Sequence, residues 1–210
     1  MKKVILGLLS FVAVSCSTTT KEVAVVPDKE EKSVEEVLLT RRSVRQYKSE
    51  TVSRKVINEI LNCGIHAPSA INRQSWEIRV VDDPKFIEGA RDIYVSLDSS
   101  RVNGVSHTFP NAPVYVFVAQ EKSFEWSSTD CGLLCGNICN AAWGKGLGTV
   151  IMGSTARAFV GTPELQLHHQ RLGFSEGYSL MAVIALGYPD ETPDVKPRDT
   201  SKIRFIEPLN

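Results

Sequence analysis

The sequence has no excess of charge of either sign, because 24 Lys and Arg residues stand against 24 Asp and Glu residues. A chain with no net charge has no overall field that could hold nucleic acid or an anionic membrane surface. An anionic ligand would therefore need a local cluster of basic residues. Internal repeats and low-complexity segments are also lacking, and a chain of 210 residues that is 42% hydrophobic is typical of one globular domain.

Histidine is scarce, and its pattern argues against a metal site. The chain has four His residues, and none of them forms a metal-binding motif. The adjacent pair, His168 and His169, is typical of a solvated helix end. We therefore expect no bound metal.

The apolar run at the N-terminus is too short to cross a bilayer as a helix. It covers residues 4–14, follows the basic start Lys2-Lys3, and leads into small residues before Cys16. This order predicts a secretion signal over residues 1–16. Its end resembles the lipobox of bacterial lipoproteins, in which the cysteine is acylated, although Ala13 stands where Leu is usual. An ordinary cleaved signal with an incidental cysteine is the alternative.

Lipidation of Cys16 would make the protein an exported, membrane-anchored lipoprotein on the periplasmic side or in the outer membrane. Residues 17–32 are polar and charged with one proline, which predicts a flexible tether. The globular domain is then expected over residues 33–210.

The remaining cysteines are interpreted as structural. Cys131, Cys135 and Cys139 are spaced by four residues on one face of an expected helix. Neighbours at this helical spacing lack disulfide geometry, and no His lies close in sequence, so close helix packing is favoured over a metal or redox site. With Cys63, four cysteines are left after lipidation, and this even number leaves a disulfide after export open.

The domain alternates helical and strand patterns, which predicts an α+β fold with one central sheet covered by helices. Helix starts are expected at Ser33, Ser53, Asp83 and Thr162, and a helix rich in small residues over 130–143. Strands are expected over 76–83, 112–120, 148–153 and 179–189, with a loop over 67–75.

A glycine-rich segment has a spacing similar to that of a dinucleotide-binding loop; its glycines are Gly144, Gly146 and Gly148. That fingerprint follows a strand and opens a helix, whereas these glycines follow a helix and lead into a strand. We interpret them as a helix stop and turn.

A basic cluster, "TRRSVRQY", follows the first expected helix. On an extended segment Arg41, Ser43 and Arg45 would point the same way and present two guanidinium groups and a hydroxyl, an arrangement suited to a phosphate. A solvated basic turn is the alternative for this motif taken alone.

Other segments favour the phosphate interpretation, because together they resemble the nitroreductase family of FMN-dependent oxidoreductases. The matching segments, in order, are "RRSVRQY", "APSAINRQSWEIRVV", "NAPVYVFV", "DCGLLCGNICNAAWGKGLGT" and "ALGYPDETPDVKPR", and they cover residues 38–198. The resemblance implies a nitroreductase-like fold with a mixed central sheet and an interlocked homodimer with two FMN sites at the subunit interface.

The resemblance also assigns roles to residues. Arg41 and Ser43, helped by Lys196 and Arg198, would hold the FMN phosphate. Arg42 would lie along the ribityl chain, and Arg45 would face the pyrimidine edge of the flavin, where a cation stabilises reduced flavin. The flavin would also be contacted by a loop of the partner subunit and by the segment after a short strand; these residues are Pro68, Ser69, Ala70, Asn72, Met152 and Gly153.

The implied reaction is ping-pong hydride transfer through flavin N5 to a nitroaromatic, quinone or similar conjugated electrophile. It requires no side-chain acid or base, so no catalytic side chain is expected. Many relatives carry Gln at the position of Gly136, and the segment between Tyr94 and Phe109 cannot be matched, which leaves the substrate open.

Two alternatives stay open at this point. One is a specialised flavoenzyme of the same fold, such as a reductive dehalogenase. The other is a non-enzymatic anchored module that binds an anionic ligand. The electron donor is open too, because NAD(P)H is a cytoplasmic pool, so we expect NAD(P)H oxidation in vitro and another donor in an exported location.

Overall fold

The computed structural model describes residues 32–97 and 109–208, and the signal, the tether and most of the segment before Phe109 lie outside them. The sheet has four strands in the order β1-β2-β4-β3, and each neighbouring pair is antiparallel. Their bounds are Trp76–Val81 (β1), Val114–Glu121 (β2), Gly148–Met152 (β3) and Tyr178–Gly187 (β4).

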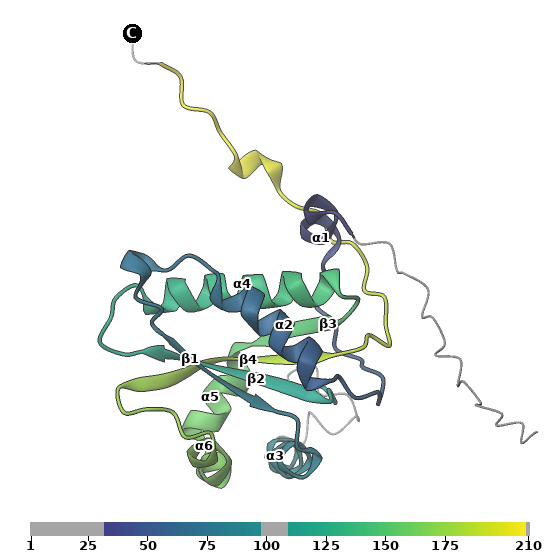
Figure 1. Ribbon diagram of the computed structural model, residues 1–210, viewed down its shortest axis with the longest axis vertical. Coiled ribbons are helices and arrows are strands. Elements are labelled where there is room, and N and C mark those ends of the chain that lie inside the picture. Colours follow the sequence, from purple (N-terminus) through teal and green to yellow (C-terminus); the bar gives the residue numbers. More distant parts are fainter. Residues whose placement is uncertain (1–31, 98–108, 209–210) are drawn as a thin grey trace, which may run out of the picture. The chain divides into compact units, whose positions relative to one another are not determined.

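Helices cover both faces of this sheet (Figure 1). One face carries α2 (Arg54–Ile65) and α4 (Ser127–Gly144), and the other carries α3 (Pro84–Ser96), α5 (Gly153–Gly161) and α6 (Gln166–Arg171). The short helix α1 (Val34–Thr40) precedes the basic cluster, and 3-10 turns occupy Ala70–Asn72 (η1), Pro163–Leu165 (η3) and Thr200–Lys202 (η4). Within the described residues, no helix is long and apolar enough to cross a bilayer.

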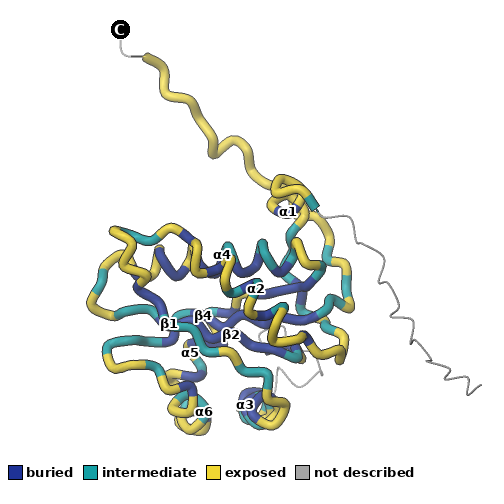
Figure 2. Tube along the Cα trace, in the orientation of Figure 1, coloured by how far each residue is buried: buried dark blue, intermediate teal, exposed yellow. Residues whose placement is uncertain are grey.

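Strand alternation divides the core into two parts. Along β2, Val114 and Val116 pack with residues of α2 and α4, whereas Tyr115 and Phe117 pack with residues of α3 and α5. Successive side chains of a strand point to opposite faces, so one strand supplies both cores. Figure 2 shows the resulting buried strands between the partly exposed helices of the two faces.

The helix starts expected at serines and Asp83 are confirmed by their caps. The side chains of Ser33 and Ser53 accept hydrogen bonds from the backbone N–H groups of Glu36 and Val56, at 3.1 and 3.4 Å. The glycine stop after α4 is confirmed as well, because Gly146 has a φ of 77° and its N–H donates to the Trp143 carbonyl at 3.0 Å.

Four details differ from the sequence prediction. Helix α4 begins at Ser127, three residues earlier than expected, and helix α5 was not expected, since its first residue Gly153 was assigned to the preceding strand. At Thr162 a 3-10 turn precedes the short α6. The sheet was expected to be mixed, whereas its four strands are antiparallel. Among the described residues, the one parallel contact is the isolated bridge between Ser43 and Thr149.

That bridge places the basic cluster against the sheet. The Val44 N–H donates to the Thr149 carbonyl of β3 at 3.0 Å, and the Val44 side chain is fully buried at 0% exposure. Val44 fits there because Gly148 has no side chain: a Cβ on Gly148 would lie 2.7 Å from the Cβ of Val44. Since real Cβ atoms do not approach this closely, the contact requires glycine.

We expect Gly148→Ala to lower the free energy of unfolding by about 1 to 3 kcal/mol, because the added methyl group overpacks the Val44 contact. Urea unfolding of the wild-type and variant proteins measures this difference. Gly161→Ala is the control, since a Cβ there would meet nothing within 4 Å. Equal midpoints for wild type and Gly148→Ala would contradict the close contact.

Candidate functional site

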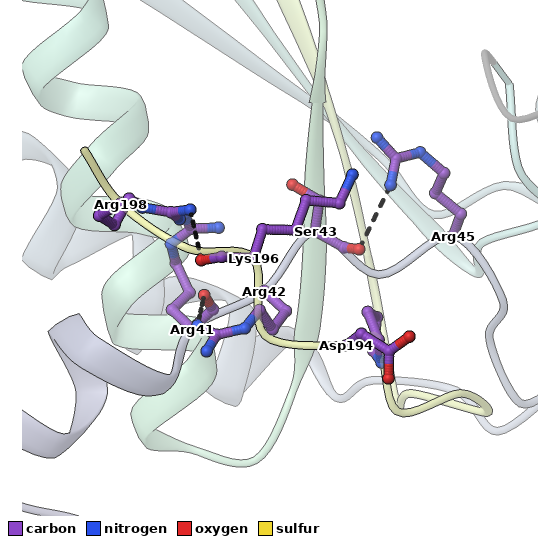
Figure 3. Close-up of a pocket in the computed structure, with 8 residues that line it drawn as sticks. Arg41, Arg42, Ser43, Arg45, Asp194, Lys196 and Arg198 are labelled. Atoms are coloured by element: carbon purple, nitrogen blue, oxygen red, sulfur yellow. Dashed lines mark hydrogen bonds between the residues drawn. The ribbon is translucent and has the colours of Figure 1, made fainter.

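The basic cluster forms one wall of a pocket whose other wall comes from the far end of the chain. The cavity has a volume of about 160 Å³. Figure 3 shows its lining, in which the extended segment after α1 faces the segment after β4. The lining residues are Arg41, Arg42, Ser43, Arg45, Pro193, Asp194, Lys196 and Arg198. The structure thus brings together all six residues that the sequence analysis placed around the flavin phosphate, ribityl chain and pyrimidine edge.

The pocket carries uncompensated positive charge. Five of its side chains are basic and one, Asp194, is acidic. Among residues 32–97 and 109–208, no carboxylate lies within ion-pair distance of any of the five basic groups. Several cations close together without counterions favour an anionic ligand, and guanidinium groups suit phosphate oxygens in particular.

Arg42 has a structural task in addition to lining the pocket. Its Nη1 donates to the Leu39 carbonyl at 2.9 Å and to the Arg41 carbonyl at 2.8 Å, which satisfies carbonyl groups at the end of α1. Its Nε is buried and has no hydrogen-bond partner. A buried donor without a partner is rare and costly, so this atom favours a ligand oxygen in the pocket.

Glu191 holds the two walls together. Its Oε1 accepts hydrogen bonds from the backbone N–H groups of Arg45 and Gln46. Nearby, the Lys48 N–H donates to the Tyr188 carbonyl at 2.9 Å, and the Asp190 N–H donates to the Gln46 carbonyl at the same distance. The sequence analysis missed Glu191, since a contact between residues 146 positions apart leaves no local pattern.

A second cavity continues from the first along α4 and β3. Its volume is about 400 Å³, and Arg41 and Ser43 line both cavities. Its further lining residues are Leu38, Gly136, Cys139, Asn140, Thr149, Val150 and Ile151. A Cβ on Gly136 would meet nothing within 4 Å, so the missing side chain at this position leaves the cavity wider.

The loop expected to contact flavin does not line either cavity. Pro68, Ser69, Ala70 and Asn72 lie between α2 and β1, and the backbone there is unusual, because Ile71 and Asn72 have φ values of 50° and 55°. Met152 is buried at the end of β3, and Gly153 begins α5. The residues predicted for the flavin site are therefore not all gathered around these two cavities.

The three cysteines of α4 are buried core residues, as their spacing predicted, whereas Cys63 on α2 is exposed. The four described cysteines are free thiols, and the three on α4 are buried. Burial raises the pKa of Cys131 and of Cys135 to about 12, and burial also raises the pKa of Cys139. A neutral buried thiol is a poor nucleophile, so packing is their role. In the part of the chain that the structure describes, no three acidic, His or Cys side chains gather as a metal site.

Comparison with known proteins identifies the family. Residues 38–188, most of the chain, match the Nitroreductase family. The chain belongs to the nitroreductase family. Its match includes the basic cluster, the 67–75 loop and all four strands, and stops before Glu191 and the segment with Lys196 and Arg198.

Named relatives and a solved structure agree with this assignment. The chain is 27% identical to an NADPH-flavin oxidoreductase of Vibrio harveyi, covering 78% of this chain and 68% of that protein. It is 25% identical to an iodotyrosine deiodinase of Thermotoga neapolitana, covering 79% and 93%. A nitroreductase of Desulfitobacterium hafniense solved with bound FMN is 28% identical, covers 83% of this chain and 98% of its own, and superposes with a TM-score of 0.71.

Proposed function

We propose that this nitroreductase-family protein binds FMN and transfers hydride from a reduced donor to a conjugated electrophile such as a nitroaromatic or quinone. The observation that carries the proposal is the pocket of unpaired basic groups around Arg41 and Ser43. The FMN-containing relative of the same fold supports FMN as the anionic ligand.

The residues of the pocket fit a terminal phosphate. Arg41, Ser43, Lys196 and Arg198 would hold the phosphate by charge-assisted hydrogen bonds, and the free Nε of Arg42 would donate to the same ligand. When bound, FMN supplies hydride transfer, accepting from the donor and giving to the acceptor in a ping-pong order. Arg45, whose Nη1 donates to the Ser43 carbonyl at 3.4 Å, would place a fixed positive charge at the flavin pyrimidine edge.

A second candidate reaction is reductive dehalogenation on the same flavin. The similarity to an iodotyrosine deiodinase over most of both chains is the observation in its favour. The segment that would cover the substrate, residues 98–108, lies outside the described residues. Turnover of a halotyrosine against a nitroaromatic by the FMN-loaded protein separates the two reactions. A colourless protein that cannot be reconstituted with FMN would favour a non-enzymatic anion-binding module instead.

We further propose a homodimer in which each subunit completes the other's flavin site. The 67–75 loop lines neither cavity of its own subunit, so its flavin contacts would be made across an interface. Apolar side chains that suit such an interface are exposed on α1, on α4 and on the segment after β4; these are Val34, Leu38, Leu39, Leu133, Ile203, Phe205 and Ile206.

The location proposed from the sequence is export with a lipid anchor on Cys16. In that location the electron donor would be membrane-linked or a small molecule, because NAD(P)H is cytoplasmic. The flavin would still accept electrons from NAD(P)H in vitro, since a fold can keep its cofactor while the donor changes.

We expect the domain from Ser33 onward to bind FMN more tightly than FAD, and Arg41→Ala to weaken FMN binding by about 1.5 to 3 kcal/mol, the range for a hydrogen bond to a charged group. Flavin fluorescence titration measures both. Arg54→Ala is the control, because Arg54 is exposed and pairs with Asp82 away from the pocket. An FMN dissociation constant unchanged by Arg41→Ala would refute the phosphate assignment.

The dimer is expected to sediment as a single species of twice the subunit mass, with flavin bound. Sedimentation velocity at several protein concentrations, with absorbance read at a flavin wavelength, tests this directly. Flavin that travels tightly bound with a monomer would show that one subunit forms a complete site.

Localisation of the full-length protein tests the proposed anchor. Wild-type protein is expected in the membrane fraction, and Cys16→Ala should be released from that fraction because its N-terminus cannot be acylated. Wild-type protein found in the cytoplasm with an intact N-terminus would remove the anchor and restore NAD(P)H as the ordinary donor.

A further inference from the structure

Asp130 is a buried carboxylate at the start of α4 that lies beneath the 67–75 loop. Asp130 is only 1% exposed. Oδ1 accepts a hydrogen bond from the Ala70 N–H at 2.9 Å, and Oδ2 accepts one from the Ser75 hydroxyl at 2.6 Å. One carboxylate therefore binds both ends of the loop segment between Ala70 and Ser75.

The loop between these two contacts has a strained backbone. Ile71, Asn72 and Gln74 have φ values of 50°, 55° and 51°. This left-handed region is sparsely populated by residues other than glycine and is a genuine outlier for the β-branched Ile71. Such strain persists only where the surrounding structure over-determines it, and it gathers at functional sites.

Packing of the loop tip does not compensate this strain, because Ile71 is 86% exposed. The compensating contacts lie at the base and sides. The Ser69 hydroxyl accepts a hydrogen bond from the Gln74 N–H at 3.1 Å, and Arg73 forms an ion pair with Glu121 at 2.6 Å. Asp130 is the buried member of this set, and its two carboxylate oxygens contact both ends of the segment.

The charge of Asp130 has no ion-pair partner among the described residues. A buried carboxylate without a cation is costly unless hydrogen bonds compensate it. Here the compensation comes from the two loop contacts and from its place in the first turn of α4, where the helix dipole favours a negative charge. The position of Asp130 and the shape of the loop are thus determined by the same bonds.

We propose that Asp130 is a positioning residue. It holds the 69–75 segment of the loop in the conformation with left-handed backbone at Ile71, Asn72 and Gln74, and this conformation places residues 69–72 against the ligand. The ligand is the partner subunit's FMN, and this part of the inference rests on the proposed function. Asp130 contacts no ligand itself and acts through the Ala70 amide and the Ser75 hydroxyl.

Three substitutions in the FMN-loaded protein test this role. Asp130→Ala removes both acceptors. Asp130→Asn keeps both contacts, since the amide oxygen accepts from Ala70 and the amide nitrogen donates to the Ser75 oxygen. Ser75→Ala removes one contact and covers the case in which Asp130→Ala fails to fold. Ile138→Ala is the control, because Ile138 lies two helical turns after Asp130 on the same helix and packs in the core against Gly64 of α2.

The first measurement is hydrogen exchange of the amides of Ala70 to Gln74, with and without FMN, and the second is the FMN dissociation constant. Asp130→Ala is expected to speed exchange at Ala70 and to raise the dissociation constant, each about tenfold, and Ser75→Ala to do so by less. Asp130→Asn should stay within about threefold of wild type in both. Ile138→Ala should change thermal stability and neither of these readouts.

Unchanged exchange in both Asp130→Ala and Ser75→Ala would overturn the positioning role. Faster exchange in Asp130→Ala with an unchanged FMN dissociation constant would overturn the link to the flavin. The same holds if Ile138→Ala changes exchange and the FMN dissociation constant as much as Asp130→Ala does. Wild-type protein that does not bind FMN would instead overturn the proposed function, and the exchange of the flavin-free protein would still decide whether Asp130 holds the loop.

Discussion

The hydrogen bond from the Val44 N–H to the Thr149 carbonyl ties the basic cluster to the sheet, and the arrangement of the pocket depends on it. This edge contact holds the segment after α1 beside β3, with Arg41, Ser43 and Arg45 at the pocket. Gly148 permits the contact, and Glu191 fixes the next two residues from the other end of the chain. A backbone hydrogen bond thus positions the basic side chains, which would bind an anion through their charge.

The pocket also shows how a chain with no net charge can bind an anion. Its 24 basic residues are balanced overall, yet five of them line one cavity in which Asp194 is the single acidic lining residue. Glu191, beside the pocket, accepts from backbone N–H groups, and other carboxylates form ion pairs elsewhere, as Asp82 does with Arg54 and Glu121 with Arg73. Local separation of charge, rather than composition, creates the site.

Much of this could be predicted from the sequence, because the signals were local. Local patterns predicted the caps at Ser33 and Ser53, the glycine stop at Gly146 and the continuous apolar run of β2, because each depends on residues a few positions apart. Helix α5 was missed because its first residue continues a strand pattern. Glu191 and Asp130 were missed because their roles are contacts with residues 146 and 60 positions away, and a single charged side chain carries no sign of what it will meet.

Helix α1 is stabilised at its C-terminal end by a side chain of the anion pocket. Its seven residues are too few for a stable isolated helix, and only Val37 among them is buried. Its last carbonyl groups are bound by Arg42, a residue that also lines the anion pocket and whose Nε is buried and unpaired. An anion bound to this guanidinium would therefore also stabilise the end of α1. Anion binding and the folding of the first helix are thus linked equilibria.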